Sequence, residues 1–128
     1  MEVRLEVTDS EGKAVRNFSS GEPVHLRLAL TNRGDAAVSL PFSSTKTHDA
    51  IVRRADGSEV WRWSAGRMFA QVISELALPP GGSEAFEASC DPRRQGQPVL
   101  PPGSYEVVGV IPAMGSELRS APVSFEVE

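Results

Sequence analysis

Apolar residues in this chain recur at every second position, and this period constrains the fold more than any other feature. Residues 3–8 read VRLEVT and residues 23–32 read PVHLRLALTN, so apolar and polar side chains alternate through both runs. The apolar face of these two runs comprises Val3, Leu5, Val7, Val24, Leu26, Leu28 and Leu30. Such alternation is typical of antiparallel strands that have one buried face and one hydrated face.

Three further runs near the end of the chain show the same pattern. Their expected inward side chains are Phe86, Ala88, Cys90, Tyr105, Val107, Val123, Phe125 and Val127. Ten prolines and eleven glycines stand mostly between the runs and leave little room for helix. One candidate for a short helical turn is SAGRMFAQVISEL, residues 64–76. The pattern predicts one all-β domain over residues 1–128, an immunoglobulin-like antiparallel β-sandwich of two sheets with about 7–9 strands and little helix.

The composition excludes several classes of function. The formal net charge is −4 and basic residues are interspersed with acidic ones, so no basic stripe is present to neutralise nucleic-acid phosphates. No apolar run approaches the ~20 residues that cross a bilayer. Residues 1–20 carry no apolar segment of a signal peptide. With the single cysteine, Cys90, these features predict a cytoplasmic protein that binds neither nucleic acid nor membrane.

The two tryptophans mark the most informative segment. Asp56-Gly57 separates AIVRRA from SEVWRW and predicts a hairpin with a type I′ turn. On the second strand Trp61 and Trp63 share a face, and we expect Trp61 to fill the gap between two sheets. Trp63 stands at the end of that strand, where we expect it to be half exposed.

Catalytic and metal-binding groups are scarce. The chain has two histidines, of which His25 is expected at the surface, while His48 and Asp49 are neighbours that should point to opposite faces of an extended chain. Cys90 is expected to be buried. No HxH, CxxC or glycine-rich phosphate motif is present. We therefore predict a protein that is not an enzyme and has no catalytic residues, no metal site and no cofactor.

The order of four segments resembles one known family. They are PVHLRLALTNRGDAAVSLPFSS, THDAIVRRADGSEVWRWSAGRMFAQ, LPPGGSEAF and PPGSYEVVGVI, and together they span roughly residues 22 to 127. In this order they resemble the BsuPI-type intracellular proteinase inhibitors, small immunoglobulin-like domains of bacteria. The most specific part is DGSEVWRWSAGRMFAQ. The resemblance implies an inhibitor of an intracellular serine protease of the subtilisin type. We expect the protein to be a monomer.

An inhibitor needs a surface loop held in one conformation, so that binding costs little ordering entropy. The candidates are residues 43–49, 64–69 and 91–103. The second loop follows a tryptophan-bearing strand and offers two large apolar side chains in succession. The expected protease-binding residues are Trp63, Ser64, Ala65, Gly66, Arg67, Met68 and Phe69. Because neighbours alternate sides, we expect Met68 to be exposed and Phe69 to close the end of the core.

Other interpretations of the same residues stay open. Residues 64–69 could simply cross from one sheet to the other. Immunoglobulin-like domains also host many functions, so the chain could be a structural or protein–protein interaction module without catalytic activity. A sheet edge that accepts a peptide strand is a third alternative.

Overall fold

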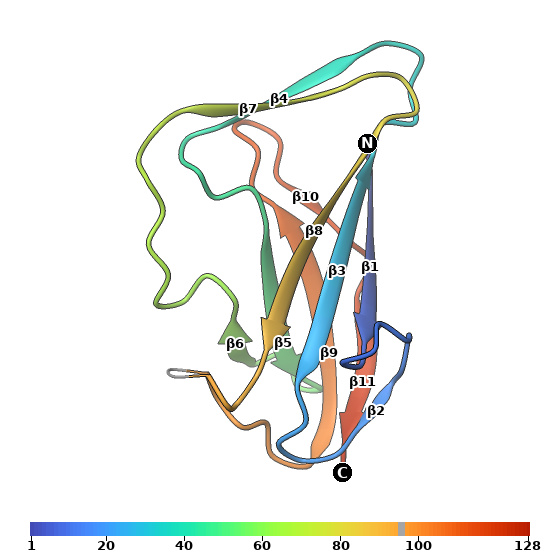
Figure 1. The fold of residues 1–128 in the computed structure, drawn as a ribbon, viewed down its shortest axis with the longest axis vertical. Helices are drawn as coiled ribbons and strands as arrows, with labels where there is room; N and C mark the ends of the chain where they lie inside the picture. Colours follow the sequence, from blue (N-terminus) through green and yellow to red (C-terminus); the bar gives the residue numbers. More distant parts are fainter. Residues whose placement is uncertain (95–96) are drawn as a thin grey trace.

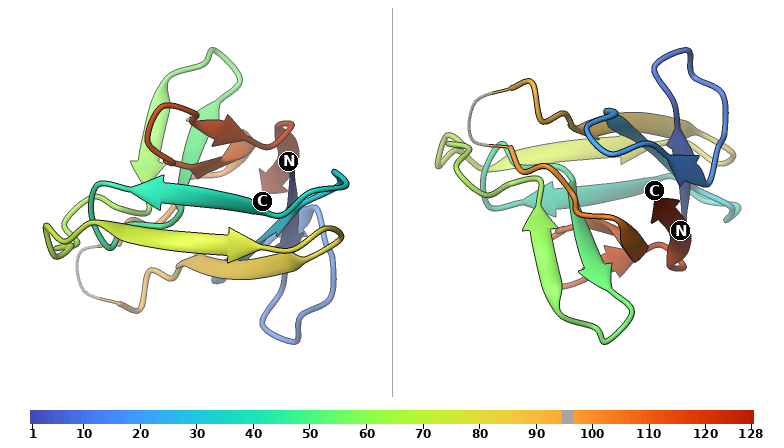
Figure 2. Two further views of the ribbon diagram at one scale, coloured as in Figure 1. Left: turned by 90° about the horizontal axis from the view of Figure 1, so that it is seen from above. Right: turned by 90° about the horizontal axis from the view of Figure 1, so that it is seen from below.

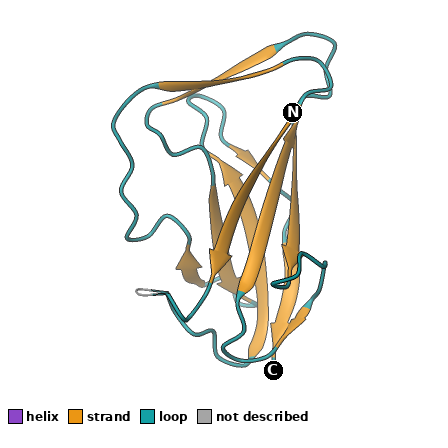
Figure 3. Ribbon diagram, viewed as in Figure 1, coloured by secondary structure: helices purple, strands orange, loops and turns teal. Residues whose placement is uncertain are grey.

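The computed structural model describes residues 1–94 and 97–128, and this part of the chain forms eleven strands and no helix (Figures 1 and 3). The strands are β1 (Glu2–Thr8), β2 (Asn17–Phe18), β3 (Val24–Thr31), β4 (Val38–Phe42), β5 (Asp49–Arg54), β6 (Glu59–Arg62), β7 (Ser74–Leu78), β8 (Ser83–Cys90), β9 (Gly103–Ile111), β10 (Leu118–Arg119) and β11 (Val123–Val127). The predicted all-β class is confirmed. The count exceeds the predicted range because β2 and β10 are pairing segments of only two residues each.

Two sheets form the sandwich. One has the order β1-β3-β8, and the other has the order β2-β11-β9-β5-β6, with β10 added to β9. All pairings are antiparallel except that of β2 with β11, which is parallel. The strands run along the long axis of the molecule, and the two termini lie toward opposite ends (Figure 1).

A third sheet departs from the predicted two-sheet arrangement. Strands β4 and β7 pair only with each other and lie across one end of the sandwich (Figure 2). β7 occupies part of the segment expected to make a helical turn, and that expectation is wrong. Leu76 and Leu78 recur at period two within β7 and pack beside Leu40 and Phe42, so pairing with β4 buries them better than a helix would.

The inner faces follow the alternation of the sequence closely. All four inward residues of β3 are buried, and so are Tyr105, Val107, Phe125 and Val127 of the opposite sheet. Val3, Leu5, Phe86 and Val123 are only half-buried, because they lie toward the edges of the core. At the centre, a Cβ added to Gly109 would stand 2.6 Å from Leu28 Cδ2, so a glycine lets the two sheets approach.

The predicted hairpin between β5 and β6 is present, but its turn is not type I′. Gly57 has a φ of 88° and is the only residue of the pair with positive φ. The Gly57 amide donates to the Arg54 carbonyl at 2.9 Å, and the Arg54 amide donates to the Ser58 carbonyl at 2.9 Å. This is a three-residue loop closed by a glycine, the next most common hairpin connection. Asp56 shapes it by accepting from the Ser58 amide at 2.8 Å.

Candidate functional site

The predicted protease-binding loop begins where β6 ends. The Trp63 amide donates to the Ala50 carbonyl at 2.9 Å and so extends the β5–β6 ladder by one residue. Two tight turns follow, closed by the Ala65 amide on the Arg62 carbonyl at 3.0 Å and the Arg67 amide on the Ser64 carbonyl at 3.1 Å. Gly66, with a φ of 77°, supplies the left-handed residue that this reversal requires. The loop therefore has a defined backbone.

A buried carboxylate ties the loop to the sandwich. Asp49, the first residue of β5, has a side chain that is only 1% exposed. Its Oδ1 accepts from the Ser64 amide at 3.0 Å and from the Ala50 amide at 2.9 Å. Its Oδ2 accepts from the Ser64 hydroxyl at 2.6 Å and pairs with Lys46 Nζ at 2.8 Å. Burial alone would raise the pKa of Asp49, but the bonds from Lys46, Ser64 and the Ala50 amide outweigh it and hold the pKa below its ordinary value.

Sequence reasoning missed this role of Asp49, which it weighed only as a partner of His48. The two side chains point apart as expected: the Asp49 oxygens face Ser64 and Lys46, whereas the His48 ring lies against aromatic residues. A sequence signal existed, because an acidic residue directly precedes the apolar run AIV of a strand. A carboxylate in that position must find donors when it is buried.

Trp63 stands in a stack that joins both sheets. The His48 ring lies between Trp63 (centroids 4.5 Å apart) and Phe86 of β8 (5.0 Å), nearly parallel to both. His48 Nε2 lies 3.0 Å from the Glu87 carbonyl oxygen, which can only accept, so this nitrogen carries the proton. Burial is the main cause that lowers the pKa of His48.

The Trp63 indole also holds the middle of the loop. The Arg67 guanidinium lies over the Trp63 ring, 4.1 Å from its centroid, and Arg67 Nε donates to the Trp63 carbonyl at 3.0 Å. The ring centroids of Phe69 and Trp63 are 6.1 Å apart, and Phe69 is partly buried. Trp61 is buried in the core at 9% exposure and Trp63 is half-buried, so both expectations for the tryptophans are confirmed.

Met68 projects from this anchored loop into solvent. Its exposed fraction is 97%, which confirms the prediction that Met68 rather than Phe69 faces outward. Two more apolar side chains that the sequence reasoning did not select, Val72 (60%) and Ile73 (76%), are exposed a few residues later. The uncharged run FAQVI gave no signal of this exposure, because apolar side chains are more often buried.

The three predicted loops lie on one flank of the molecule. The Thr45 amide donates to the Ala70 carbonyl at 3.0 Å, and the Ala70 amide donates back to Thr45 Oγ1 at 3.0 Å, so residues 43–49 support the chain that follows Phe69. From the third loop, Arg94 and Gln97 share a hollow of about 320 Å³ with Trp63 and the 64–69 loop. Residues 95–96 of that third loop lie outside the described residues.

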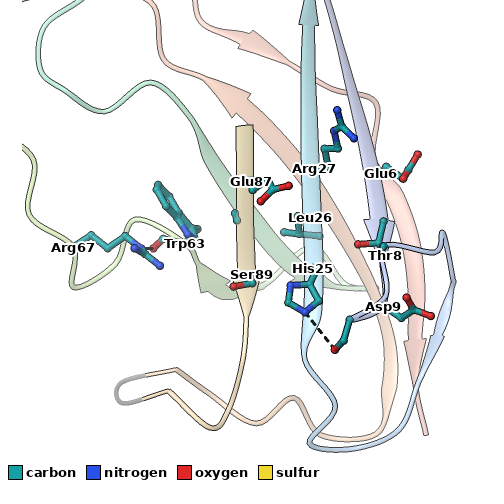
Figure 4. A pocket seen from close by; sticks show the side chains of 13 residues that line it. Glu6, Thr8, Asp9, His25, Leu26, Arg27, Trp63, Arg67, Glu87 and Ser89 are labelled. Atoms are coloured by element: carbon teal, nitrogen blue, oxygen red, sulfur yellow. Dashed lines mark hydrogen bonds between the residues drawn. The ribbon is translucent and has the colours of Figure 1, made fainter. Parts of the chain in front are cut away.

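A polar groove of about 420 Å³ adjoins the loop on the outer face of the β1-β3-β8 sheet (Figure 4). Trp63 and Arg67 stand at one end of it, and Glu6, His25, Arg27 and Glu87 are among the strand residues that line it. His25 is half-exposed there, consistent with the expected surface position. Charges of both signs alternate across the groove, which gives it no preference for a strongly charged ligand.

Cys90 is buried as predicted, and burial raises the pKa of its thiol to about 11, so it is a neutral thiol at physiological pH. Within residues 1–94 and 97–128, no three His, Cys, Asp or Glu side chains converge as a metal site. Among the described residues there is no helix long and apolar enough to cross a membrane.

The fold and the site together define an immunoglobulin-like β-sandwich that presents one anchored surface loop with an exposed apolar tip. A model of the family described as intracellular proteinase inhibitor, BsuPI, matches residues 13–116. The chain belongs to this family of inhibitors, which confirms the resemblance found in the sequence. No curated protein matches the chain.

Solved structures share the fold at low sequence identity. The C-terminal domain of wzt superposes with a TM-score of 0.61 at 12% identity, over 97% of this chain and 70% of that one. The CARDB domain of the PF1109 protein from Pyrococcus furiosus, solved with di-metal ions, gives 0.51 at 10% identity over 99% and 88%. The DNA glycosylase AlkC of Pseudomonas fluorescens gives 0.54 at 17% identity, where this chain spans only 30% of that protein. These likenesses show the sandwich fold alone.

Proposed function

We propose that this protein is a cytoplasmic, single-domain, monomeric inhibitor of a subtilisin-type serine protease, and that it acts through the loop Trp63–Phe69. One observation carries the proposal: Met68 is 97% exposed on a loop whose first residues are fixed by the hydrogen bonds between Ser64 and Asp49. Family membership supports inhibition of an intracellular proteinase in general.

A loop that is already ordered loses little conformational entropy when it binds. Here the Asp49 bonds hold one end, and the stack of Arg67 on Trp63 holds the middle, so Met68 is presented from a rigid base. An unbranched, polarisable thioether adapts its shape to an apolar pocket. This property suits a protease whose specificity pocket is apolar.

Val72 and Ile73 extend the same apolar surface. They lie on the connection that runs along the flank from β6 to β7 (Figure 1), after the point where Thr45 holds Ala70. A chain held at intervals in this way can lie along a partner as an added strand, with alternate side chains entering pockets. Because neighbouring side chains of a strand point to opposite sides, we propose that one of these two residues makes a secondary contact with the protease.

The test measures inhibition of a purified subtilisin-type intracellular protease by Met68→Asp. A carboxylate that must enter an apolar pocket should weaken inhibition at least about tenfold, which is about 1.4 kcal/mol. The melting temperature should not change, because the side chain is exposed. Met114→Asp is the matched control. Met114 is 49% exposed, and its amide donates to the carbonyl of Pro41 in β4, away from the loop.

Unchanged inhibition by a stably folded Met68→Asp variant would move the contact to residues 43–49 or 91–103. If the wild-type protein inhibits no serine protease of this type but binds another protein, the alternative of an interaction module is correct. A pull-down from cell lysate, followed by identification of any retained protease, separates the two functions.

A further inference from the structure

Met68 is the most accessible of the three methionines in the chain. Its exposed fraction is 97%, against 49% for Met114 and 39% for Met1. Oxidation of a thioether requires that the oxidant reach the sulfur, so reactivity follows exposure. The competing sulfur, Cys90, is buried and its raised pKa keeps it as an unreactive thiol. The exposed loop thus carries the sulfur atom that an oxidant meets first.

We propose that Met68 is a reversible modification site, at which a peroxide-class oxidant switches off the contact between the loop and its protease. The modification itself stands on exposure alone, whereas its effect on inhibition rests on the function proposed above. In the forward step the thioether sulfur attacks one peroxide oxygen, the O–O bond breaks, and a sulfur–oxygen bond forms. The second peroxide oxygen departs with the electron pair of the broken O–O bond, takes up the proton of the transferred oxygen and leaves as water, and methionine becomes methionine sulfoxide.

The reverse step belongs to methionine sulfoxide reductases working with a dithiol. The sulfoxide oxygen leaves as water, and the dithiol is oxidised to a disulfide. The reductase must reach the modified side chain, and at 97% exposure Met68 meets that requirement without any opening of the fold.

Oxidation at this position changes the interface and leaves the fold intact. The loop geometry is held by Asp49, Ser64, Trp63 and Arg67, none of which uses the Met68 side chain. A sulfoxide is polar and accepts strong hydrogen bonds, so its burial in an apolar pocket without a donor is unfavourable. The free inhibitor should therefore keep its melting temperature while its affinity for the protease falls.

The experiment treats the purified protein with hydrogen peroxide, removes the oxidant with catalase, and follows two readouts in time. Peptide mass mapping should show one added oxygen on Met68 before Met114 or Met1. Inhibition of a subtilisin-type protease should weaken about tenfold or more in step with Met68 sulfoxide, and a sulfoxide reductase with dithiol should restore it. In Met68→Leu, peroxide should leave the inhibition constant unchanged relative to untreated variant, whereas Met114→Leu should respond like wild type.

Two results overturn the proposal. Equal or slower oxidation of Met68 relative to Met114 would refute the modification site. Complete Met68 oxidation with an unchanged inhibition constant would refute the switch. Absence of inhibition by the untreated protein is a failure of the proposed function, and the mass map then still decides whether Met68 is the reactive methionine.

Discussion

Replacement of Asp49 by asparagine should loosen the base of the inhibitory loop while the sandwich stays folded. Asparagine has nearly the same shape, and its Oδ1 can still accept from the Ala50 and Ser64 amides, now at 2.9 and 3.0 Å. Its amide nitrogen replaces Oδ2, which accepts from the Ser64 hydroxyl at 2.6 Å and pairs with Lys46 at 2.8 Å. The substitution therefore removes one acceptor and one charge at the base of the loop.

The loss of stability expected from Asp49→Asn follows from the contacts of Oδ2 with the Ser64 hydroxyl and with Lys46. A hydrogen bond to a charged, buried acceptor contributes about 1.5–3 kcal/mol. Lys46 is 26% exposed, so its pairing with Asp49 is worth about 0–1 kcal/mol more. Through the loss of both contacts, Asp49→Asn should lower the free energy of unfolding by about 1.5–4 kcal/mol. Ser64→Ala removes only the hydroxyl contact and keeps the pairing with Lys46, so it should cost about 1.5–3 kcal/mol.

Urea unfolding at neutral pH measures the loss of stability, and hydrogen exchange at the Ser64 amide reports whether the loop base opens faster. The inhibition constant should weaken in the same order, Asp49→Asn more than Ser64→Ala. A change in unfolding free energy within about 0.5 kcal/mol, the usual range for surface substitutions, would refute the reasoning.

The difference in unfolding free energy between the wild-type protein and Asp49→Asn should also depend on pH. The folded state holds the pKa of Asp49 below the ordinary value of 3.8, so the unfolded chain binds a proton first as the pH falls. The stability that the carboxylate contributes is therefore complete above about pH 4 and is lost as the pH falls through the lowered pKa. The difference in unfolding free energy between wild type and Asp49→Asn should be constant above about pH 4 and shrink as the pH falls below it. A constant difference would show that the charge of Asp49 is irrelevant.

Three further predictions concern the core. Trp61→Ala should cost about 3–5 kcal/mol, the range for emptying a large buried site, and a melting temperature within a few degrees of wild type would contradict it. Cys90 should react with a thiol reagent only after unfolding, because burial raises its pKa to about 11, and rapid labelling of the native protein would show the opposite. Gly109→Ala should destabilise by about 1–3 kcal/mol, since its Cβ would stand 2.6 Å from Leu28; Gly34→Ala, where the nearest atom is 3.4 Å away, is the control.

The strands and the hairpin were predictable because their signals are local. The four inward leucine and valine positions of β3 and the buried Trp61 follow from alternation alone, since side chains of a strand point to opposite faces in turn. The position of the β5–β6 hairpin follows from Asp56-Gly57. Its turn type did not, because Asp56 keeps negative φ and lets Gly57 alone take the left-handed conformation.

The β4–β7 sheet was not predictable from local pattern. Residues 64–76 contain apolar groups compatible with more than one period, and the pairing of Leu76 and Leu78 with a strand 36 residues earlier decides between them. The exposure of Val72 and Ile73 has the same origin, because the chain must cross the flank to reach β4.

The sequence by itself determined the fold class, the burial of Cys90 and the outward position of Met68, because each depends on the alternation of neighbouring side chains. Only the tertiary structure decided how the loop is held. Asp49 contacts Ser64, and His48 lies between Trp63 and Phe86, through contacts between residues that are 15 to 38 positions apart in the chain. Such contacts leave no periodic trace, since the partners of a buried carboxylate or ring can come from any part of the chain.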